Sequence, residues 1–429
     1  MISLSDLPDD IFIHQIYSFM VHHHGYEYDR SAKFWFFMTA SLISKRFYIL
    51  SLQCEQAMRI CLNSNTVESF LKFCKAGRGC SFRKLSISYA TDFKLTTDMF
   101  ENLLSSNFCS LKNLDLGVGA QGWNYWRNEF GAERCRILTK YFQTNFPKLE
   151  KLSLISNQIG LHGCVELDHR SLKQLTCLQL DNCDIYDEAC MHLAQGNLSN
   201  LTKLGLYRNS IGDEGCKYLS NGKLVKLKYL YLSHNKIGTE GCQHIGMNSR
   251  ENLPALEELT LLHNKIDDEG CKHLSEISTL KYLSVGDHCT DDACTHLAKL
   301  QNLTHLDLST SSNVGCSGFS VLMTQLTQLT SLDLSKSSQL NDAAIESIDL
   351  DCFKRISTLK LSSCSQITNK TSQYLINHAQ YFSSLKTLYI HGTEISDDEK
   401  KTLRSKFPDL YIDRMVRRVY PSTFFNIYE

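Results

Sequence analysis

Leucines along the chain follow a pattern that recurs about every 26 residues, and two consecutive copies lie between residues 201 and 237. Within a copy, leucine occupies positions one, four and six, asparagine position nine and isoleucine position eleven. The first copy contains Leu201, Leu204, Leu206, Asn209 and Ile211, and the second contains Leu227, Leu230, Leu232, Asn235 and Ile237. This recurrence predicts a repeat protein.

Each copy predicts a short strand, a turn and a short helix. Leucines two residues apart, such as Leu204 and Leu206, lie on the same side of a strand because side chains alternate between its two faces. After the turn, Cys216 precedes Leu219 by three residues, which is typical of an apolar stripe on a helix. Such units stack on their neighbours and bury one continuous core.

The pattern LxxLxLxxNxI resembles the leucine-rich repeat, and the resemblance extends over residues 82–412. About twelve copies are followed by a last short strand from Phe407. The copies begin at Phe82, Leu111, Leu149, Leu175, Leu201, Leu227, Leu256, Leu280, Leu303, Leu329, Ile356 and Leu385. Paired strands lie about 4.8 Å apart and packed helices about 8 to 10 Å apart, so stacked copies bend with their strands inside. The predicted fold is an α/β leucine-rich-repeat solenoid, a horseshoe with a concave parallel sheet.

Residues 1–53 are predicted to form a small α-helical domain ahead of the repeats. They contain Leu-Pro-x-x-Ile near their start and Ser-Leu-Ile-Ser-Lys-Arg-Phe near their end, and these motifs resemble an F-box. The link between the motifs, around residues 21–35, is longer than is usual in that family. The resemblance implies docking on a Skp-type adaptor, and hence a cullin, through Leu7, Pro8, Ile11, Ile16, Phe19, Leu42 and Phe47. The alternative is an ordinary helical cap over the end of the repeat core.

Three further segments depart from the repeat pattern. Residues 54–81 are predicted to be a linker and an irregular first repeat, with a strand from Ala57. The enlarged segment between Leu111 and Leu149 contains Trp123 and Trp126, which either cover the edge of that repeat or form a binding rim. Residues 413–429 are basic and aromatic, and they form either a cap over the last repeat or a contact with a partner.

Charge and targeting signals limit the classes of partner. Lys plus Arg number 45 and Asp plus Glu number 46, which argues against a nucleic-acid or membrane partner selected by bulk charge. The amino terminus is acidic where a signal peptide needs a basic start, and no stretch reaches about 18 apolar residues. With 18 cysteines kept as thiols, the expected compartment is the cytosol or the nucleus.

Six cysteines recur once per repeat in the predicted helices, and this period assigns them to the core. They are Cys164, Cys190, Cys216, Cys242, Cys271 and Cys294. A buried cysteine packs as a small apolar residue. No CxxC pair occurs, so neither a zinc site nor any cofactor is expected.

The alternation along each strand predicts a binding face on the concave side. Positions three, five and seven point away from the buried leucines, and position eight follows them in the turn. In the central repeats these positions gather tyrosines, histidines and charged residues, which form a patch with hydrogen-bonding tips. The predicted target-binding residues are Lys203, Tyr207, Arg208, Tyr229, Tyr231, His234, Glu258, His263 and Tyr282. The alternative is that cross-strand tyrosine pairs only stabilise the sheet.

No catalytic constellation is found, so the protein is not expected to be an enzyme. The F-box resemblance implies a substrate-recognition subunit of an SCF-type ubiquitin ligase, which docks on the Skp-type adaptor and holds a target protein in the repeats. The alternative is a leucine-rich-repeat scaffold or inhibitor without a ligase connection. The target's identity cannot be read from the sequence.

Overall fold

The computed structural model describes residues 57–62, 70–72, 75, 82–89, 95–117, 131–167, 172–196 and 198–413. The F-box-like segment, Trp123, Trp126 and the residues after 413 lie outside this part of the chain. The chain divides into two units. The first runs to Asp184 and includes Gly196–Leu198, and the second comprises Ile185–Gln195 and the residues from Ser199 onward.

The first unit alternates short strands and helices. Its strands are β1 (Ala57–Leu62), β2 (Lys84–Tyr89), β3 (Asn113–Asp115), β4 (Lys151–Ser153) and β5 (Cys177–Gln179), and its helices are α5 (Thr97–Leu104), α6 (Gly131–Asn145) and α7 (Gly160–Leu167). The strands pair in chain order, and every described pairing between them is parallel. The strand predicted from Ala57 is therefore confirmed as β1.

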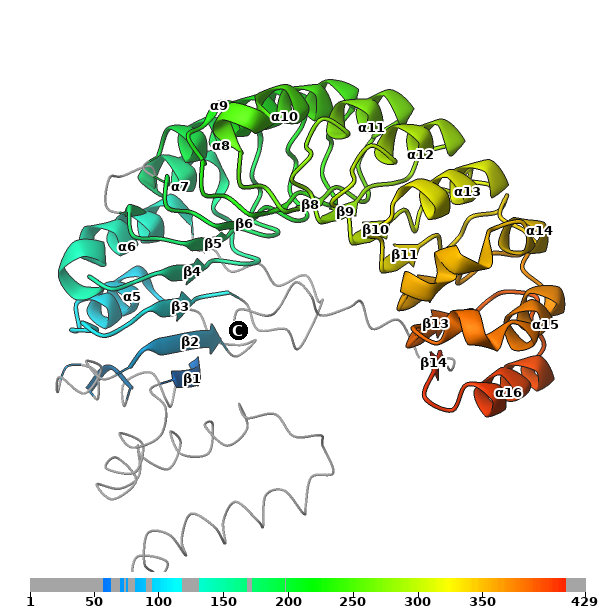
Figure 1. Cartoon of the computed structure of the whole chain (residues 1–429). Coiled ribbons are helices and arrows are strands. Elements are labelled where there is room, and N and C mark those ends of the chain that lie inside the picture. The colour runs from blue at the N-terminus through cyan, green and yellow to red at the C-terminus, as the bar shows by residue number, and fades with distance from the viewer. Residues whose placement is uncertain are drawn as a thin grey trace, which may run out of the picture. The chain divides into compact units, whose positions relative to one another are not determined.

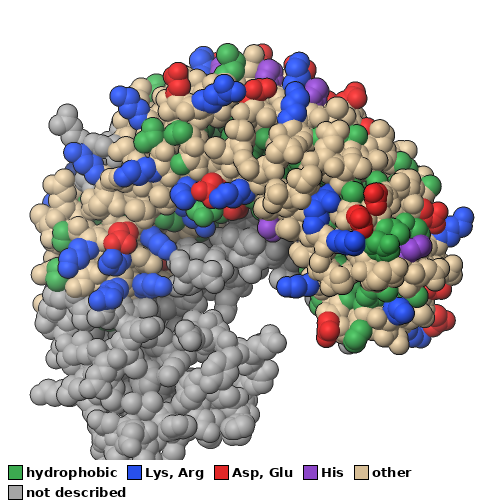
Figure 2. Space-filling view, in the orientation of Figure 1, with side chains coloured by type: hydrophobic (Ala, Val, Ile, Leu, Met, Phe, Trp, Pro, Cys, Tyr) green, Lys and Arg blue, Asp and Glu red, His purple; other side chains and the backbone are tan. Residues whose placement is uncertain are grey.

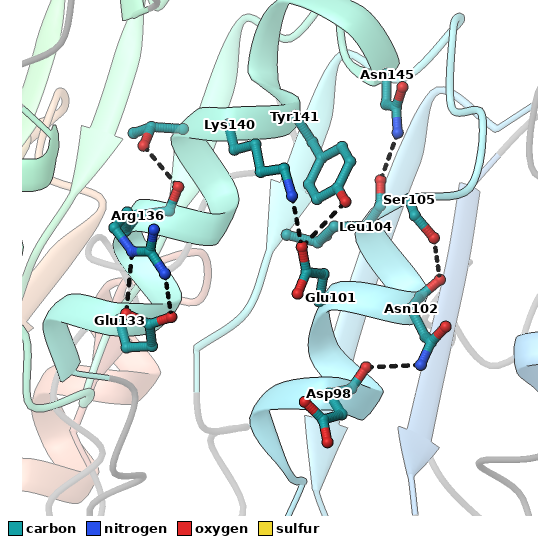
Figure 3. A network of polar contacts seen from close by, with 11 residues as sticks. Asp98, Glu101, Asn102, Leu104, Ser105, Glu133, Arg136, Lys140, Tyr141 and Asn145 are labelled. Atoms are coloured by element: carbon teal, nitrogen blue, oxygen red, sulfur yellow. Dashed lines mark hydrogen bonds and ion pairs between the residues drawn. The ribbon is translucent and has the colours of Figure 1, made fainter.

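Polar contacts tie α5 to α6 in the first unit (Figure 3). The Nζ atom of Lys140 lies 2.7 Å from Glu101 Oε1, and the hydroxyl of Tyr141 donates to the same oxygen at 3.2 Å. The hydrogen bond from Lys140 is the main reason that the pKa of Glu101 is lowered. Asn145 donates to the carbonyl of Leu104 at 2.7 Å and satisfies a carbonyl at the end of α5.

The second unit repeats the same arrangement over more copies. Its strands are β6 (Lys203–Gly205), β7 (Tyr229–Tyr231), β8 (Glu258–Thr260), β9 (Tyr282–Ser284), β10 (His305–Asp307), β11 (Ser331–Asp333), β12 (Thr358–Lys360), β13 (Thr387–Tyr389) and β14 (Tyr411–Ile412). They too pair parallel in chain order. Within this unit the strands line the inner side of the arc and the helices lie outside them (Figure 1).

The helical layer of the second unit contains α8 (Asp187–Gln195), α9 (Asp213–Asn221), α10 (Thr239–Asn252), α11 (Asp268–Leu274), α12 (Asp291–Leu297), α13 (Cys316–Gln325), α14 (Asp342–Glu346), α15 (Asn369–Asn377) and α16 (Asp397–Lys406). Two 3₁₀ helices, η4 (Leu350–Arg355) and η5 (Ala379–Phe382), join it. At several of these helices, the side chain of the N-cap residue accepts a hydrogen bond from a backbone amide in the first turn. For example, Asp267 accepts from the amide of Gly270 at 2.9 Å, and Ser396 accepts from Glu399.

The repeat pattern agrees with the strands and with the core. Each of the twelve predicted copies begins two residues before a strand, from Phe82 before β2 to Leu385 before β13. The leucines at positions one, four and six of the first copy described above, Leu201, Leu204 and Leu206, are all fully buried. The predicted α/β leucine-rich-repeat solenoid is therefore confirmed.

The asparagines at position nine hydrogen-bond the backbone of the turns. Asn235 Nδ2 donates to the carbonyls of Leu232 and Leu206 at 2.9 Å each, and its Oδ1 accepts from the amide of Ile211 at 3.0 Å. The side chain therefore satisfies backbone groups of two successive repeats. Cys183 takes this place in one repeat and donates its thiol to the carbonyl of Leu154 at 3.0 Å.

The periodic cysteines lie in the core, where the pattern placed them. All six, Cys164, Cys190, Cys216, Cys242, Cys271 and Cys294, are fully buried. Burial raises the pKa of Cys164 to about 12 and that of Cys216 well above its ordinary value. Such thiols stay protonated near neutral pH and act as apolar packing groups.

Candidate protein-binding face

The strands of the second unit present one row of side chains at position three, on the face away from the helices. Lys203, Tyr229, Glu258 and Tyr282 are successive register partners on β6, β7, β8 and β9. All four are half-buried, whereas the leucines that follow them are buried. The structure thus brings four of the predicted target-binding residues side by side on neighbouring strands.

Tyr231 is more buried than the sequence pattern indicates. Its exposed fraction is 7%, although position five points away from the helices. The Lys203 ammonium lies 5.1 Å from the centre of its ring, and its hydroxyl is hydrogen-bonded to the carboxylate of Glu258. Tyr231 therefore links a lysine and a glutamate from the strands on either side of it.

The electrostatics of Glu258 follow from this arrangement. Burial raises the pKa of Glu258, and the hydrogen bond from Tyr231 and the charge of Lys203 offset part of that effect. A partly desolvated carboxylate interacts more strongly with an added charge or donor than one in open water. Lys203, Tyr231 and Glu258 form one polar cluster across β6, β7 and β8.

The residues at position eight have left-handed backbones. The φ angles are 57° at Arg208, 58° at His234 and 57° at His263, although such values favour glycine or asparagine. Hydrogen bonds between repeats hold these turns, because the amide of Arg208 donates to the carbonyl of Ser233 at 2.9 Å and that of His234 to Leu262 at 2.8 Å.

The rings at these turns contact one another along the edge of the sheet. Tyr207 meets His234 edge to face with ring centres 5.0 Å apart, and His234 lies 4.1 Å from His263. His263 Nδ1 is 3.7 Å from a carboxylate oxygen of Asp287. Burial lowers the pKa of His234 to about 4, with smaller effects from His263 and Arg208, so this ring is neutral near pH 7.

A second row of charged residues lies farther along the sheet, outside the predicted target-binding set. At position five, Asp307, Asp333 and Lys360 are successive register partners on β10, β11 and β12. The repeat register places them on the same face as Tyr231, and the predicted target-binding residues do not include them. The charges of Asp307 and Asp333 at position five, continued by Lys360 in the next repeat, were the signal that could have found this row.

Lys360 is held between an acid and an aromatic ring. Its Nζ atom lies 3.2 Å from Asp333 Oδ2 and 5.6 Å from the centre of the Tyr389 ring. On the other side, Asp307 accepts from the amide of Ser309 at 2.9 Å, and the hydroxyl of Ser284 lies 3.4 Å from it. Burial, with repulsion from Asp333, raises the pKa of Asp307 to about 6.

The visible surface of the second unit shows no single dominant charge. In the space-filling view, lysine and arginine side chains are interspersed with aspartates and glutamates over the part of the second unit that is in view (Figure 2). Among the described residues there is no group of three or more side chains placed to hold a metal ion. None of the described helices has the length and apolar character that a membrane crossing requires.

Comparison with family models identifies the repeats. Residues 197–220, 223–246 and 253–275 match a model described as a leucine-rich repeat, and no F-box model matches residues 1–53. A search of curated proteins finds no significant match.

Many solved structures are similar to this chain, among them three of low sequence identity. A leucine-rich-repeat protein of Leptospira interrogans shares 18% identity with a TM-score of 0.44, over 85% of this chain and 91% of that one. An internalin of Listeria monocytogenes shares 20% with a TM-score of 0.50, over 82% and 94%. A chain of the yeast Rad7 and Elc1 complex shares 15% with a TM-score of 0.54, over 96% and 98%.

At these identities the likeness to the last two structures shows the fold alone. Together with the matched segments, it shows that this protein contains leucine-rich repeats in a solenoid. Solenoids of this class are scaffolds for protein–protein interaction, because their stacked strands offer an extended surface.

Proposed function

We propose that this protein is the substrate-recognition subunit of an SCF-type ubiquitin ligase. The inner face of the second unit would hold the target protein, and residues 1–53 would dock on a Skp-type adaptor. The observation that carries the target-binding half is the row of Lys203, Tyr229, Glu258 and Tyr282 on adjacent strands. These side chains combine aromatic area with hydrogen-bonding tips, as residues at protein-binding hot spots do.

The left-handed turns beside this row extend the proposed surface. Arg208 and His263 are exposed and follow the strands that carry Lys203 and Glu258. A backbone hydrogen bond to the next repeat fixes the position of Arg208 before a target arrives. A preorganised face loses less conformational entropy on binding, which favours recognition.

The adaptor-binding half of the proposal rests on sequence. Leu7, Pro8 and Ile11 match the start of an F-box, and residues 41–47 match its end. The similar yeast chain occurs in a complex of two proteins, Rad7 and Elc1. A chain of this fold can therefore form a complex with a second protein. In the proposed role no chemistry is needed from this chain. It would raise the effective concentration of target lysines near a charged conjugating enzyme.

The adaptor-binding proposal is tested by co-purification of a Skp-type adaptor with the full chain. Replacement of Leu7, Pro8 and Ile11 by alanine is expected to abolish adaptor recovery and to leave target recovery unchanged. Replacement of Tyr229 and Glu258 by alanine is expected to do the reverse. Failure of the intact chain to retain an adaptor would reject the ligase connection.

A scaffold or inhibitor without a ligase connection is the second candidate. It is favoured by the family comparison, in which leucine-rich repeats match and an F-box does not. Under this reading the tyrosine and glutamate replacements still release the target, while the changes at Leu7, Pro8 and Ile11 affect nothing. The same pair of variants therefore separates the two functions.

A further inference from the structure

Two thiols of the second unit lie in direct contact across the boundary between two repeats. The Sγ atoms of Cys271 and Cys289 are 3.4 Å apart, and either thiol can donate a hydrogen bond to the other. Cys271 lies on α11, and Cys289 lies in the segment between β9 and α12. Both are fully buried thiols.

Cys289 occupies a place that isoleucine takes in the preceding repeats. Ile237 and Ile266 each stand five residues before the cysteine of their helix, and Cys289 stands five residues before Cys294. The two isoleucines and Cys289 are all fully buried. Isoleucine is larger and would fill this place with more apolar contact. What a cysteine contributes here is a second thiol beside Cys271.

The segment that carries Cys289 contacts two other elements. Two residues before it, a carboxylate oxygen of Asp287 lies 3.7 Å from His263 Nδ1. Directly after it, Thr290 donates its amide and its hydroxyl to the carboxylate of Asp268 at 2.8 and 2.7 Å. A displacement of Cys289 is therefore expected to alter both the pair at His263, on the edge of the binding face, and the junction between α11 and α12.

We propose that Cys271 and Cys289 form an oxidative modification site, at which hydrogen peroxide converts the two thiols into an intramolecular disulfide. One sulfur, as its thiolate, attacks a peroxide oxygen, so that an S–O bond forms, the O–O bond breaks and the released hydroxide takes up a proton to leave as water. The second thiol then attacks the oxidised sulfur. An S–S bond forms, the S–O bond breaks, and the hydroxyl leaves with the proton of that thiol as a second water.

The geometry favours disulfide formation over further oxidation of one sulfur. The neighbouring sulfur is already 3.4 Å away, and a disulfide requires an approach to about 2.05 Å. Cys289 lies between the named elements, in a connecting segment that can shift by this amount more readily than a helix. A thiol held beside a sulfenic acid captures it at a high effective concentration.

Burial makes the first step slow and selects for a small oxidant. The hydrogen bond with Cys289, followed by burial, raises the pKa of Cys271 well above its ordinary value, so its thiolate is scarce. Hydrogen peroxide is close to water in size, and it reaches the pair when α11 or α12 opens locally. Each of these helices has 7 residues, and helices this short depend on packing for their stability.

The test treats the purified full chain with hydrogen peroxide, blocks the remaining thiols with iodoacetamide and digests the protein without reduction. Mass spectrometry is expected to find a peptide that links Cys271 to Cys289 and that a reducing agent separates. Trypsin leaves Cys289 and Cys294 on one peptide, so fragment spectra are needed to place the bond at Cys289. The yield of this link should exceed that of any other cysteine pair about ten-fold.

Two variants and a matched control make the test specific. Cys289→Ile restores the residue of the preceding repeats, and it is expected to abolish the link while the protein stays folded, as thermal melting would show. Cys294→Ala removes a nearby buried cysteine and should leave the link at its parent yield. The proposal is overturned if Cys271 and Cys289 stay reduced after prolonged exposure to peroxide that oxidises Cys316 and Cys352, or if the link forms only in urea.

The consequence for target binding rests on the proposed function of the face. In the linked form Cys289 moves toward α11, so the ring signals of His263 in NMR spectra are expected to shift. Peroxide should leave those signals unchanged in Cys289→Ile. Unshifted signals in the fully linked parent protein would reject any effect of the disulfide on the face. Because the disulfide assay uses neither adaptor nor target, its failure leaves the co-purification test of the proposed function unaffected.

Discussion

The carboxylate of Asp213 accepts a hydrogen bond from the backbone amide of Gly241 at 2.9 Å, so the start of α9 holds the start of α10. The same oxygen accepts from the amide of Gly238 at 2.6 Å. Amides in the first turn of a helix have no partner within the helix, and a carboxylate there also suits the helix dipole. An aspartate in one repeat therefore caps the helix of the next.

This contact recurs along the second unit and accounts for the acidic residues at the helix starts. Asp187 accepts from Gly212, Asp268 from Thr290, Asp291 from Gly315 and Asp342 from Thr368. Each of these aspartates lies in the first turn of its own helix, where its charge suits the helix dipole. In the structure they also connect neighbouring repeats.

Replacing Gly241 by alanine tests this junction. An added Cβ would lie 2.6 Å from Asp213 Oδ1 and 2.7 Å from Ile237 Cγ2, too close for either to remain in place. The expected loss of unfolding free energy is about 1–3 kcal/mol, even though alanine favours a helix interior over glycine by about 1 kcal/mol. Urea unfolding followed by circular dichroism measures it.

The matched control is Gly238→Ala in the same turn. There an added Cβ would lie 3.4 Å from the Asp213 carboxylate, which is an ordinary contact. The expected loss is less than about 1 kcal/mol, the usual effect at a helix cap. If both variants unfolded at the same urea concentration, the close approach at Gly241 would not matter to stability.

Replacing Asn235 tests the turns. Asn235→Ala leaves the carbonyls of Leu206 and Leu232 and the amide of Ile211 without their side-chain partner. Buried backbone groups without partners are costly, so a loss of about 2–4 kcal/mol is expected in urea unfolding. Asn235→Cys is the informative comparison, since Cys183 fills this place naturally. Asn235→Cys should lose less unfolding free energy than Asn235→Ala. An equal loss in the two variants would contradict a hydrogen-bonding role for this position.

The repeat positions could be predicted because each is fixed by period and burial together. Leucine at position four and cysteine in the helix recur in successive repeats. Because the repeats stack, equivalent residues have equivalent surroundings in every copy. The sheet, its register and its core follow from that regularity. Even the role of Asn235 could be inferred, because a buried turn needs a side chain that both donates and accepts.

The details of the binding face could not be predicted in the same way. Alternation shows that Tyr231 points away from the leucines, but it shows neither the burial of this side chain nor its contacts with Lys203 and Glu258 from other repeats. Likewise, Arg208 and His234 adopt left-handed backbones that their residue types do not favour. Hydrogen bonds from the next repeat impose that conformation, and no local sequence signal encodes it.

Asp307 makes stability depend on pH in a defined direction. Its pKa is raised to about 6, mainly by burial and then by Asp333, whereas an unfolded chain has the ordinary value of 3.8. Between these values the folded state binds a proton that the unfolded state does not, so this group's contribution to stability falls as pH rises. Asp307→Asn is therefore expected to stabilise the protein by about 1–2 kcal/mol above pH 6.

Well below pH 3.8, Asp307 is protonated in both the folded and the unfolded chain, and the variant should match the parent protein. Urea unfolding at several pH values provides the comparison. Asp351→Asn, at an exposed site, should show no such pH-dependent gain. A constant difference across the pH range would mean that the raised pKa of Asp307 does not contribute.

The buried thiols provide a measure of the intact core. Thiolate is the form that reacts with alkylating reagents, and burial raises the pKa of Cys216 and Cys242 well above the ordinary value. Both side chains are fully buried, whereas Cys316 and Cys352 are partly exposed. Brief treatment with iodoacetamide is therefore expected to label Cys316 and Cys352 and to spare Cys216 and Cys242, as read by peptide mass spectrometry.

Labelling in urea supplies the control, since all four thiols should react once the chain is unfolded. In Gly241→Ala, labelling of Cys242 under native conditions should increase, because this residue directly follows the perturbed position in α10. Labelling of Cys316, which lies on α13, should not change. Rapid native labelling of Cys242 in the parent protein would show that this part of the core opens more readily than its packing indicates, because reaction requires the thiol to meet water.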